Sequence, residues 1–129
     1  MGKYKTFEDL EVYKKSMDLV EKIYSTSRLP SFSKDFGLVD QIRRASVSIP
    51  SNIAEGMERD GNKELINFLY IAKGSCGEVE CQLQIAERLG YIDHPLYTEL
   101  YNFVVEIAKA LGKMILYLKE SDFKGKKYK

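Results

Sequence analysis

The strongest constraint on the fold is a run of apolar residues between positions 100 and 118 that recurs at alternating intervals of four and three. The pattern places these residues on one face of an α-helix, because a helix completes a turn about every 3.6 residues. A heptad repeat also favours packing at about 20° against neighbouring helices. We therefore predict a long helix in a bundle, with Asp93 as its N-cap and Pro95 in its first turn. The apolar residues are Leu100, Val104, Ile107, Leu111, Met114 and Leu118.

Two earlier stretches also carry apolar residues at helical spacing. The first helix is expected to begin at Thr6, whose hydroxyl can cap it. It should end at Arg28-Leu29-Pro30, because the residue before a proline avoids helical dihedral angles. The second helix is expected over about residues 35–59. Pro50 lies inside it and removes one backbone hydrogen bond, which predicts a bend rather than a break.

A third helix is predicted after the turn Asp60-Gly61-Asn62, with Asn62 as its N-cap and Gly90 at its end. No strand signal of comparable strength is present. Four amphipathic helices joined by short turns predict an all-α fold, an antiparallel up-down-up-down four-helix bundle. We expect one domain over residues 1–129, with frayed ends at about 1–5 and 121–129.

Charge and composition limit the classes of function. The chain has 20 Lys and Arg residues and 19 Asp and Glu residues. A protein that binds nucleic acid mainly through phosphate contacts usually has a clear excess of basic residues. The chain has no apolar run of about 18 residues and no signal-peptide pattern, so we expect neither a membrane protein nor an exported one. Cys76 and Cys81 point to different sides of a helix and are expected to stay reduced in the cytoplasm. The apolar stripes are wider than one core needs, which predicts self-association.

The sequence does not indicate catalytic or metal chemistry. His94 is the only histidine and sits at a predicted helix start beside Pro95. The carboxylates lack the spacing of metal ligands. No nucleophile elbow surrounds a serine, and no glycine-rich phosphate loop follows a strand. We therefore expect no enzyme, no cofactor, and no catalytic or metal-binding residue.

The most informative feature is a polar stripe on the second helix, in which residues recur at spacings of four and three. The third helix carries a similar stripe that includes Gly74 and Glu78. Residues level with each other across the turn at Gly61 should have numbers that sum to about 122. Arg44 is then level with Glu78, and Ser48 with Gly74, whose missing side chain would permit close helix packing. The polar stripe of the second helix consists of Arg44, Ser48, Asn52, Glu55 and Arg59.

These positions support two interpretations. In the first, Arg44 and Glu78 form an interhelical ion pair that fixes the register of the two helices. Breaking such a pair when it is buried costs about 3–5 kcal/mol. In the second, Arg43, Arg44, Arg59 and Lys63 present positive charge to the phosphates of RNA or DNA. The residue pattern alone leaves both interpretations open.

Three segments resemble one bacterial family: the four-helix bundle proteins encoded in intervening sequences of 23S ribosomal RNA genes. The similarity spans roughly residues 4–119. Its most specific part is the polar stripe with its flanking residues, followed by the glycine-containing stretch of the third helix. The matching segments are Phe7–Val12, Gln41–Ser46, Ser48–Gly56, and Phe68–Ser75 together with Glu78.

The resemblance implies a non-enzymatic bundle that assembles into a homopentamer with a central opening. The family also includes the accessory protein of diversity-generating retroelements, which binds nucleic acid and partners a reverse transcriptase. For this chain, the resemblance implies binding to the RNA or DNA backbone at Arg43, Arg44 and Arg59, with a nucleic-acid enzyme such as a reverse transcriptase as a further partner. The alternative is a structural or protein-interaction scaffold whose arginines form interhelical and intersubunit pairs, since this chain is nearly neutral.

Overall fold

The computed structural model describes Phe7 and residues 10–127, with side chains described as far as Ser121. This part of the chain contains helices and no strand, which confirms the predicted all-α class. One short helix was not predicted. The helices are α1 (Glu11–Thr26), α2 (Pro30–Ser33), α3 (Phe36–Glu58), α4 (Asn62–Arg88) and α5 (His94–Lys127).

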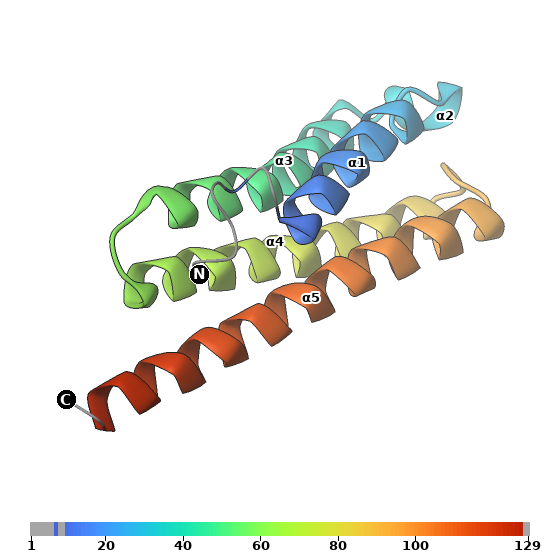
Figure 1. The fold of residues 1–129 in the computed structure, drawn as a ribbon. Coiled ribbons are helices and arrows are strands. Elements are labelled where there is room, and N and C mark those ends of the chain that lie inside the picture. The colour runs from blue at the N-terminus through green and yellow to red at the C-terminus, as the bar shows by residue number, and fades with distance from the viewer. Residues whose placement is uncertain (1–6, 8–9, 128–129) are drawn as a thin grey trace.

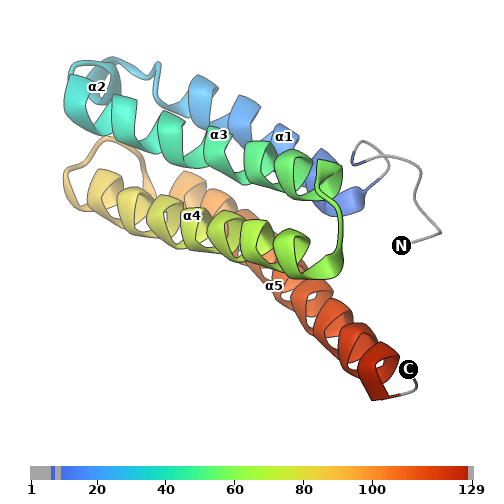
Figure 2. The same ribbon diagram turned by 90° about the vertical axis from the view of Figure 1, so that its left-hand side faces the viewer.

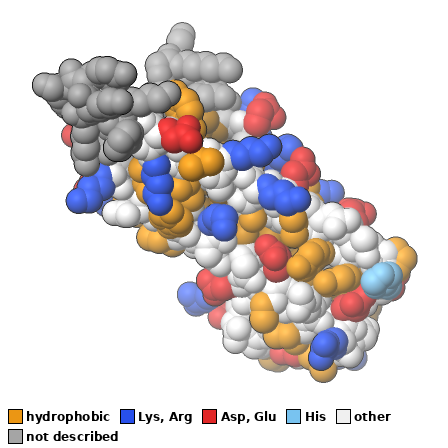
Figure 3. Space-filling view, turned by 90° about the horizontal axis from the view of Figure 1, so that it is seen from below, with side chains coloured by type: hydrophobic (Ala, Val, Ile, Leu, Met, Phe, Trp, Pro, Cys, Tyr) orange, Lys and Arg blue, Asp and Glu red, His pale blue; other side chains and the backbone are white. Residues whose placement is uncertain are grey.

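The four long helices form the predicted up-down-up-down bundle (Figures 1 and 2). Each packs against its neighbours in chain order, and α1 also packs against α5 to complete the arrangement. The contact between α3 and α4 is the most extensive. Towards its C-terminal end, α5 diverges from the other long helices (Figures 1 and 2), and Figure 3 shows the molecule from the side of α5.

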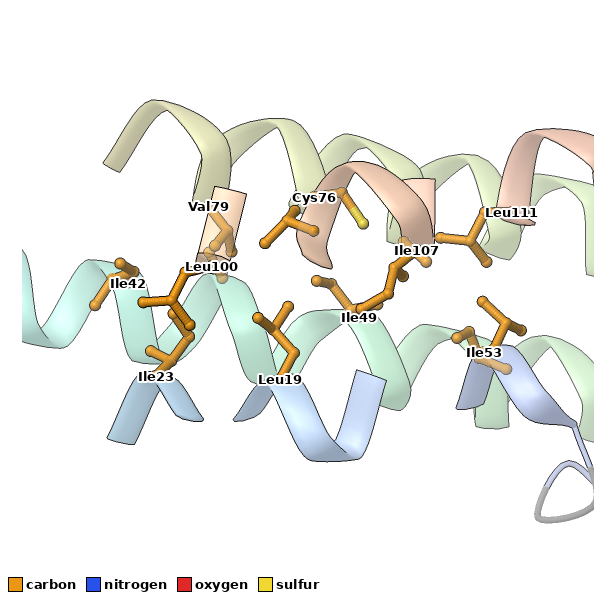
Figure 4. Close-up of a cluster of buried hydrophobic side chains, with 14 of the residues drawn as sticks. Leu19, Ile23, Ile42, Ile49, Ile53, Cys76, Val79, Leu100, Ile107 and Leu111 are labelled. Atoms are coloured by element: carbon orange, nitrogen blue, oxygen red, sulfur yellow. The ribbon is translucent and has the colours of Figure 1, made fainter. Parts of the chain in front are cut away.

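The core consists of the heptad residues of α5 and the matching stripes of the other three long helices. Figure 4 shows their side chains directed into the shared interior. Burying one such aliphatic side chain contributes about 1.5–3 kcal/mol relative to leaving it exposed. Met114, predicted for this face, is only partly buried, and Ile115 takes its place in the core. The labelled side chains of the core are Leu19, Ile23, Ile42, Ile49, Ile53, Cys76, Val79, Leu100, Ile107 and Leu111.

The helix starts follow the predicted capping chemistry in one case and depart from it in another. Asp93 is confirmed as the cap of α5, because its Oδ1 accepts a hydrogen bond from the backbone N–H of Leu96 at 2.9 Å. Asn62 is not the N-cap of α4. Gly61 takes that position with φ of 90°, a conformation open to glycine, and Asn62 is the first helical residue. The predicted cap Thr6 lies outside the described residues, and α1 begins at Glu11.

Two further helix boundaries differ from the prediction: the start of α2 and the end of α5. Pro30 does not simply end a helix but starts α2, because proline is well suited to the first helical position. This short helix buries Phe32, whose ring stacks on Tyr91 with centroids 5.5 Å apart. α3 passes through Pro50 without a break, as predicted. α5 extends to Lys127, into the segment expected to fray.

Candidate interaction surfaces

Arg43 joins α3 to the end of α1. Its Nε donates a hydrogen bond to Ser27 Oγ at 2.8 Å, and its guanidinium lies over the Tyr24 ring, 4.5 Å from the centroid. The side chain is half-buried. The Nε donor and one face of the guanidinium are therefore already occupied by contacts within the chain. This geometry gives Arg43 a role in holding two helices together.

The predicted ion pair between Arg44 and Glu78 is not formed. Arg44 Nε instead lies 2.9 Å from Asp40 Oδ2, one turn earlier on the same helix, and the Arg44 side chain is 79% exposed. Arg44 and Glu78 nevertheless lie level with each other, on opposite rims of a groove of about 400 Å³ between α3 and α4. Asp40 competes successfully because a side chain four residues away is in reach without bridging the groove.

The predicted close approach of Ser48 and Gly74 is also wrong. The Ser48 hydroxyl accepts hydrogen bonds from Ser75 Oγ and Asn52 Nδ2, each at 2.9 Å. Gly74 faces solvent, and a Cβ added to it would meet nothing within 4 Å. The glycine that does permit close packing of α3 on α4 is Gly56, where a Cβ would lie 2.8 Å from Phe68 Cβ and 3.0 Å from Leu65 Cδ1.

The four cations proposed for phosphate binding do not form one patch. Arg59 lies at the C-terminal end of α3, where it pairs with Glu55 at 3.5 Å and lies over the Phe68 ring. Lys63 is exposed in the first turn of α4. Arg43 and Arg59 are sixteen residues apart on one helix, a separation of about 24 Å. The structure thus brings Arg59 and Lys63 to one end of α3 and leaves Arg43 and Arg44 further along.

A second group of cations, which was not predicted from the sequence, lies on α5 and the adjoining side of α4. Lys109 and Lys113 are exposed one turn apart on α5. Lys73 of α4 reaches across to α5, where its Cε lies 3.5 Å from a Cβ built on Gly112. Lys119 Nζ donates a hydrogen bond to Tyr70 Oη at 2.6 Å. Among the described side chains, none of these lysines has a carboxylate oxygen within 4.0 Å.

We call Lys73, Lys109, Lys113 and Lys119 the lysine face. Figure 3 shows this side of the molecule. Most of the Lys and Arg side chains in the view lie far from the histidine. The acidic side chain Glu120 lies close by on α5 and is exposed. A signal for this face was present in the sequence, because the four-residue spacing of Lys109 and Lys113 puts both opposite the apolar heptad positions.

In the described part of the chain, the histidine and the two cysteines lie apart from one another. His94 Nδ1 lies 2.5 Å from Glu87 Oε2, which links the start of α5 to the end of α4. Cys76 is buried, and burial raises the pKa of its thiol to about 12. The nearby charge of Glu80 makes a second, smaller contribution in the same direction. Cys81 is exposed, and both thiols are free. The described residues hold no group of three or more His, Cys, Asp or Glu side chains arranged to bind a metal ion.

The fold and these surfaces define a class: an all-helical bundle protein that exposes charged side chains on several of its helices. The chain belongs to the 23S rRNA-intervening sequence protein family, whose model matches residues 8–113. No helix in the described part of the chain is both long and apolar enough to cross a membrane.

A solved structure supports the same assignment. It is the crystal structure of a protein with unknown function from the S23 ribosomal protein family of Bacteroides thetaiotaomicron VPI-5482. The two chains are 31% identical and superpose with a TM-score of 0.76. The match covers 81% of this chain and 97% of the other. No curated protein sequence matches this chain.

Proposed function

We propose that this protein is a non-catalytic homo-oligomer, a pentamer as its family resemblance implies, that binds the phosphate backbone of RNA or DNA without reading sequence. The observation that carries the proposal is the lysine face. Its four ammonium groups are free of carboxylate partners among the described side chains. Unpaired lysines attract phosphates and release counterions when they bind them.

The dimensions of the lysine face suit a short length of nucleic-acid backbone. Lys109 and Lys119 are ten residues apart on α5, which corresponds to about 15 Å along the helix axis. The exposed ring of Tyr70 lies beside Lys119 and offers a surface on which a base can stack. One copy supplies few contacts, but several copies in one assembly bind together and gain avidity. A nearly neutral chain can therefore bind nucleic acid.

The four cations predicted from the sequence contribute less to the proposed binding than the lysine face does. Arg43 is engaged by Ser27 and Tyr24, and Arg59 by Glu55. Arg44 and Lys63 are exposed, and they lie on α3 and the start of α4 rather than on the lysine face. The family's link to ribosomal RNA genes favours RNA in the bacterial cytoplasm, where the free thiols would remain reduced.

Fluorescence anisotropy of a labelled single-stranded RNA, titrated with protein at several salt concentrations, tests the binding. The variant Lys109→Gln/Lys113→Gln is expected to weaken binding and to reduce the log–log salt slope by about 1.4 per copy in contact, or 0.7 per lost phosphate contact. The control Arg28→Gln/Lys34→Gln removes the same charge on either side of α2, at the other end of the bundle (Figure 1). Equal losses in both variants would contradict a localised lysine face.

Static light scattering tests the assembly. We expect a mass several times the 14.8 kDa of one chain, and five times that mass if the protein is a pentamer. A mass near 14.8 kDa at micromolar concentration would refute oligomerisation and with it the avidity argument.

A second candidate function is that of a scaffold for other proteins, such as a reverse transcriptase or another nucleic-acid enzyme. The observation in its favour is that the motif arginines are used in pairs and stacks within the chain: Arg43 with Tyr24, Arg44 with Asp40, and Arg59 with Glu55. Absence of RNA and DNA binding at about 50 mM salt, where electrostatic binding is strong, would favour the scaffold.

A further inference from the structure

The solvent side of α4 carries a stripe of small residues that the fold of one chain does not explain. Gly74, Gly77 and Cys81 recur there at intervals of three and four and are all exposed. A Cβ added to either glycine would meet nothing within 4 Å. Glycine inside a helix is less stable than alanine, so two such positions without an internal packing role are unfavourable in an isolated chain. Large apolar side chains at Ile71 and Ile85 border the stripe and are also exposed.

The groove beside this stripe contains a polar group without a partner. Gln82 lines the groove between α3 and α4 and is only 7% exposed. Its Oε1 is buried and accepts no hydrogen bond from the described residues. Leaving a buried acceptor unpaired is costly. A donor from outside the chain, reached after rotation of the carboxamide, would remove that cost.

The solvent side of α3 carries a complementary stripe. Phe36, Arg44, Val47 and Glu58 recur there at helical spacing, and all four are exposed. Phe36 is 81% exposed, which is unusual for so large an apolar side chain. Asp40 lies between Phe36 and Arg44 on the same side and pairs with Arg44, so the stripe presents one aromatic ring, one cation, one branched aliphatic side chain and two anions.

The two stripes match each other in height along the bundle. The packing of α3 on α4 shows which residues are level: Ser48 with Ser75, whose numbers sum to 123, and Gly56 with Leu65 and Phe68, whose numbers sum to 121 and 124. By the same rule, each exposed residue of the α3 stripe is level with a complementary residue of α4. The level pairs are Phe36 with Ile85, Arg44 with Glu78, Val47 with Gly74, and Glu58 with Lys63.

We propose that the solvent side of α4 packs against the solvent side of α3 in a second copy of this chain, within a ring whose axis runs along the bundle. This inference rests on the oligomer proposed above and names its interface. Rotation about such an axis keeps every residue at its own height, so the level residues of the two stripes meet between copies. A head-to-tail contact of this kind forms a closed ring when its repeated rotation completes a full turn, as it does in a pentamer.

The charges and shapes fit a second copy in particular. Glu78 of one copy meets Arg44 of the next. The Nε of Arg44 is paired with Asp40 of its own helix, and its remaining N–H donors can serve Glu78 and Gln82, one turn further along α4. Val47 enters the space left by Gly74, and Phe36 covers Ile85. These contacts use no residue of the lysine face, which stays available to nucleic acid.

A glycine substitution separates this interface from internal packing. Gly74→Gln adds a side chain that has open space in a single chain, so the bundle is expected to stay folded by circular dichroism. Between copies it would occupy the space of Val47, and we expect the dissociation constant of the assembly to rise about tenfold or more. The control is Gly112→Gln, a helix-interior glycine of α5 where an added Cβ makes only an ordinary contact with Lys73. It should leave the assembly intact.

Analytical ultracentrifugation of the three proteins over a concentration range distinguishes the outcomes. A wild-type protein that remains a monomer refutes the oligomer and the interface together. A wild-type oligomer that Gly74→Gln leaves unchanged refutes this interface alone. Dissociation by Gly74→Gln but not by Gly112→Gln supports it.

A charge exchange tests the register of the interface. Arg44→Glu and Glu78→Arg should each dissociate the assembly by placing like charges opposite each other, and the double variant should restore it. Failure of the double variant to restore the assembly would overturn the proposed pairing of α3 and α4.

Discussion

The packing at Gly56 gives a prediction whose magnitude follows from the structure. A Cβ at this position would lie 2.8 Å from Phe68 Cβ, a separation that real Cβ atoms essentially never show, and 3.0 Å from Leu65 Cδ1. Leu65 Cδ1 is the end of a flexible side chain and can move. Phe68 Cβ is attached directly to the backbone of α4, so relief requires a shift of one helix against the other. Gly56→Ala therefore strains the most extensive helix contact of the bundle.

Two opposing effects determine the size of the change. Alanine raises helix stability by about 1 kcal/mol relative to glycine. Overpacking a well-filled contact costs about 1–3 kcal/mol. Gly112→Ala carries the same gain in helix propensity, but its Cβ makes only an ordinary contact of 3.5 Å with Lys73. The difference between the two variants isolates the packing cost, for which we expect about 2 kcal/mol. A difference of this size corresponds to roughly 4–8 °C in Tm.

Urea denaturation followed by circular dichroism measures both variants against the wild type. All three must be compared at one protein concentration, because association contributes to apparent stability. Gly56→Ala should fall below the wild type in unfolding free energy, and Gly112→Ala should equal or exceed it. If the two alanine variants are equally stable, α3 and α4 are not in close contact at Gly56 and the packing argument is wrong.

Three further predictions concern single side chains. Arg43→Ala should destabilise the bundle by about 1–2 kcal/mol in urea unfolding, because it removes a hydrogen bond and the stacking on Tyr24; an unchanged midpoint would argue against its role between α1 and α3. The pKa of Asp35 is lowered by hydrogen bonds from the backbone N–H three residues later and from the Tyr91 hydroxyl. Its stabilising contribution is therefore present above the ordinary pKa and lost as pH falls through the lowered one, so Asp35→Asn should cost stability at pH 7 and little at about pH 2. Cys81 should react with maleimide in the dissociated Gly74→Gln variant and more slowly in the assembled wild type, whereas the buried thiol of Cys76 should react in neither; mass spectrometry after limited labelling would show which thiol is modified.

The pairing of α3 with α4 shows what the sequence could predict and what it could not. Helical period and the turn at Gly61 determine which residues are level, and Ser48 indeed lies within one residue of the predicted level. Level alone does not determine which side chain faces the partner helix. Adjacent residues differ by about 100° around the helix axis. Ser75 therefore points at α3, while Gly74, one residue earlier, points at solvent.

The outcome for Arg44 has a different physical cause. Glu78 was correctly predicted to be level with it, but a long exposed side chain pairs with whichever carboxylate it reaches at least cost in entropy. Asp40 lies one turn away on the same helix and is nearer than the far rim of the groove. The choice between two such partners depends on the width of the groove, which the spacing of residues along the chain does not encode.

The lysine face shows why net charge is a poor guide to a binding surface. On the α1 side of α5, Lys15 and Lys22 are matched by Glu106 and Glu99. These pairs cancel in the total but do not engage Lys109 and Lys113 of the same helix, which stand without such partners among the described side chains. Screening in physiological salt acts over about 8 Å, so a phosphate at the lysine face responds to nearby charges rather than to the sum over the chain. A ring joined through α3 and α4 would repeat this local field once per copy, and it is the local field, multiplied by assembly, that the proposed binding depends on.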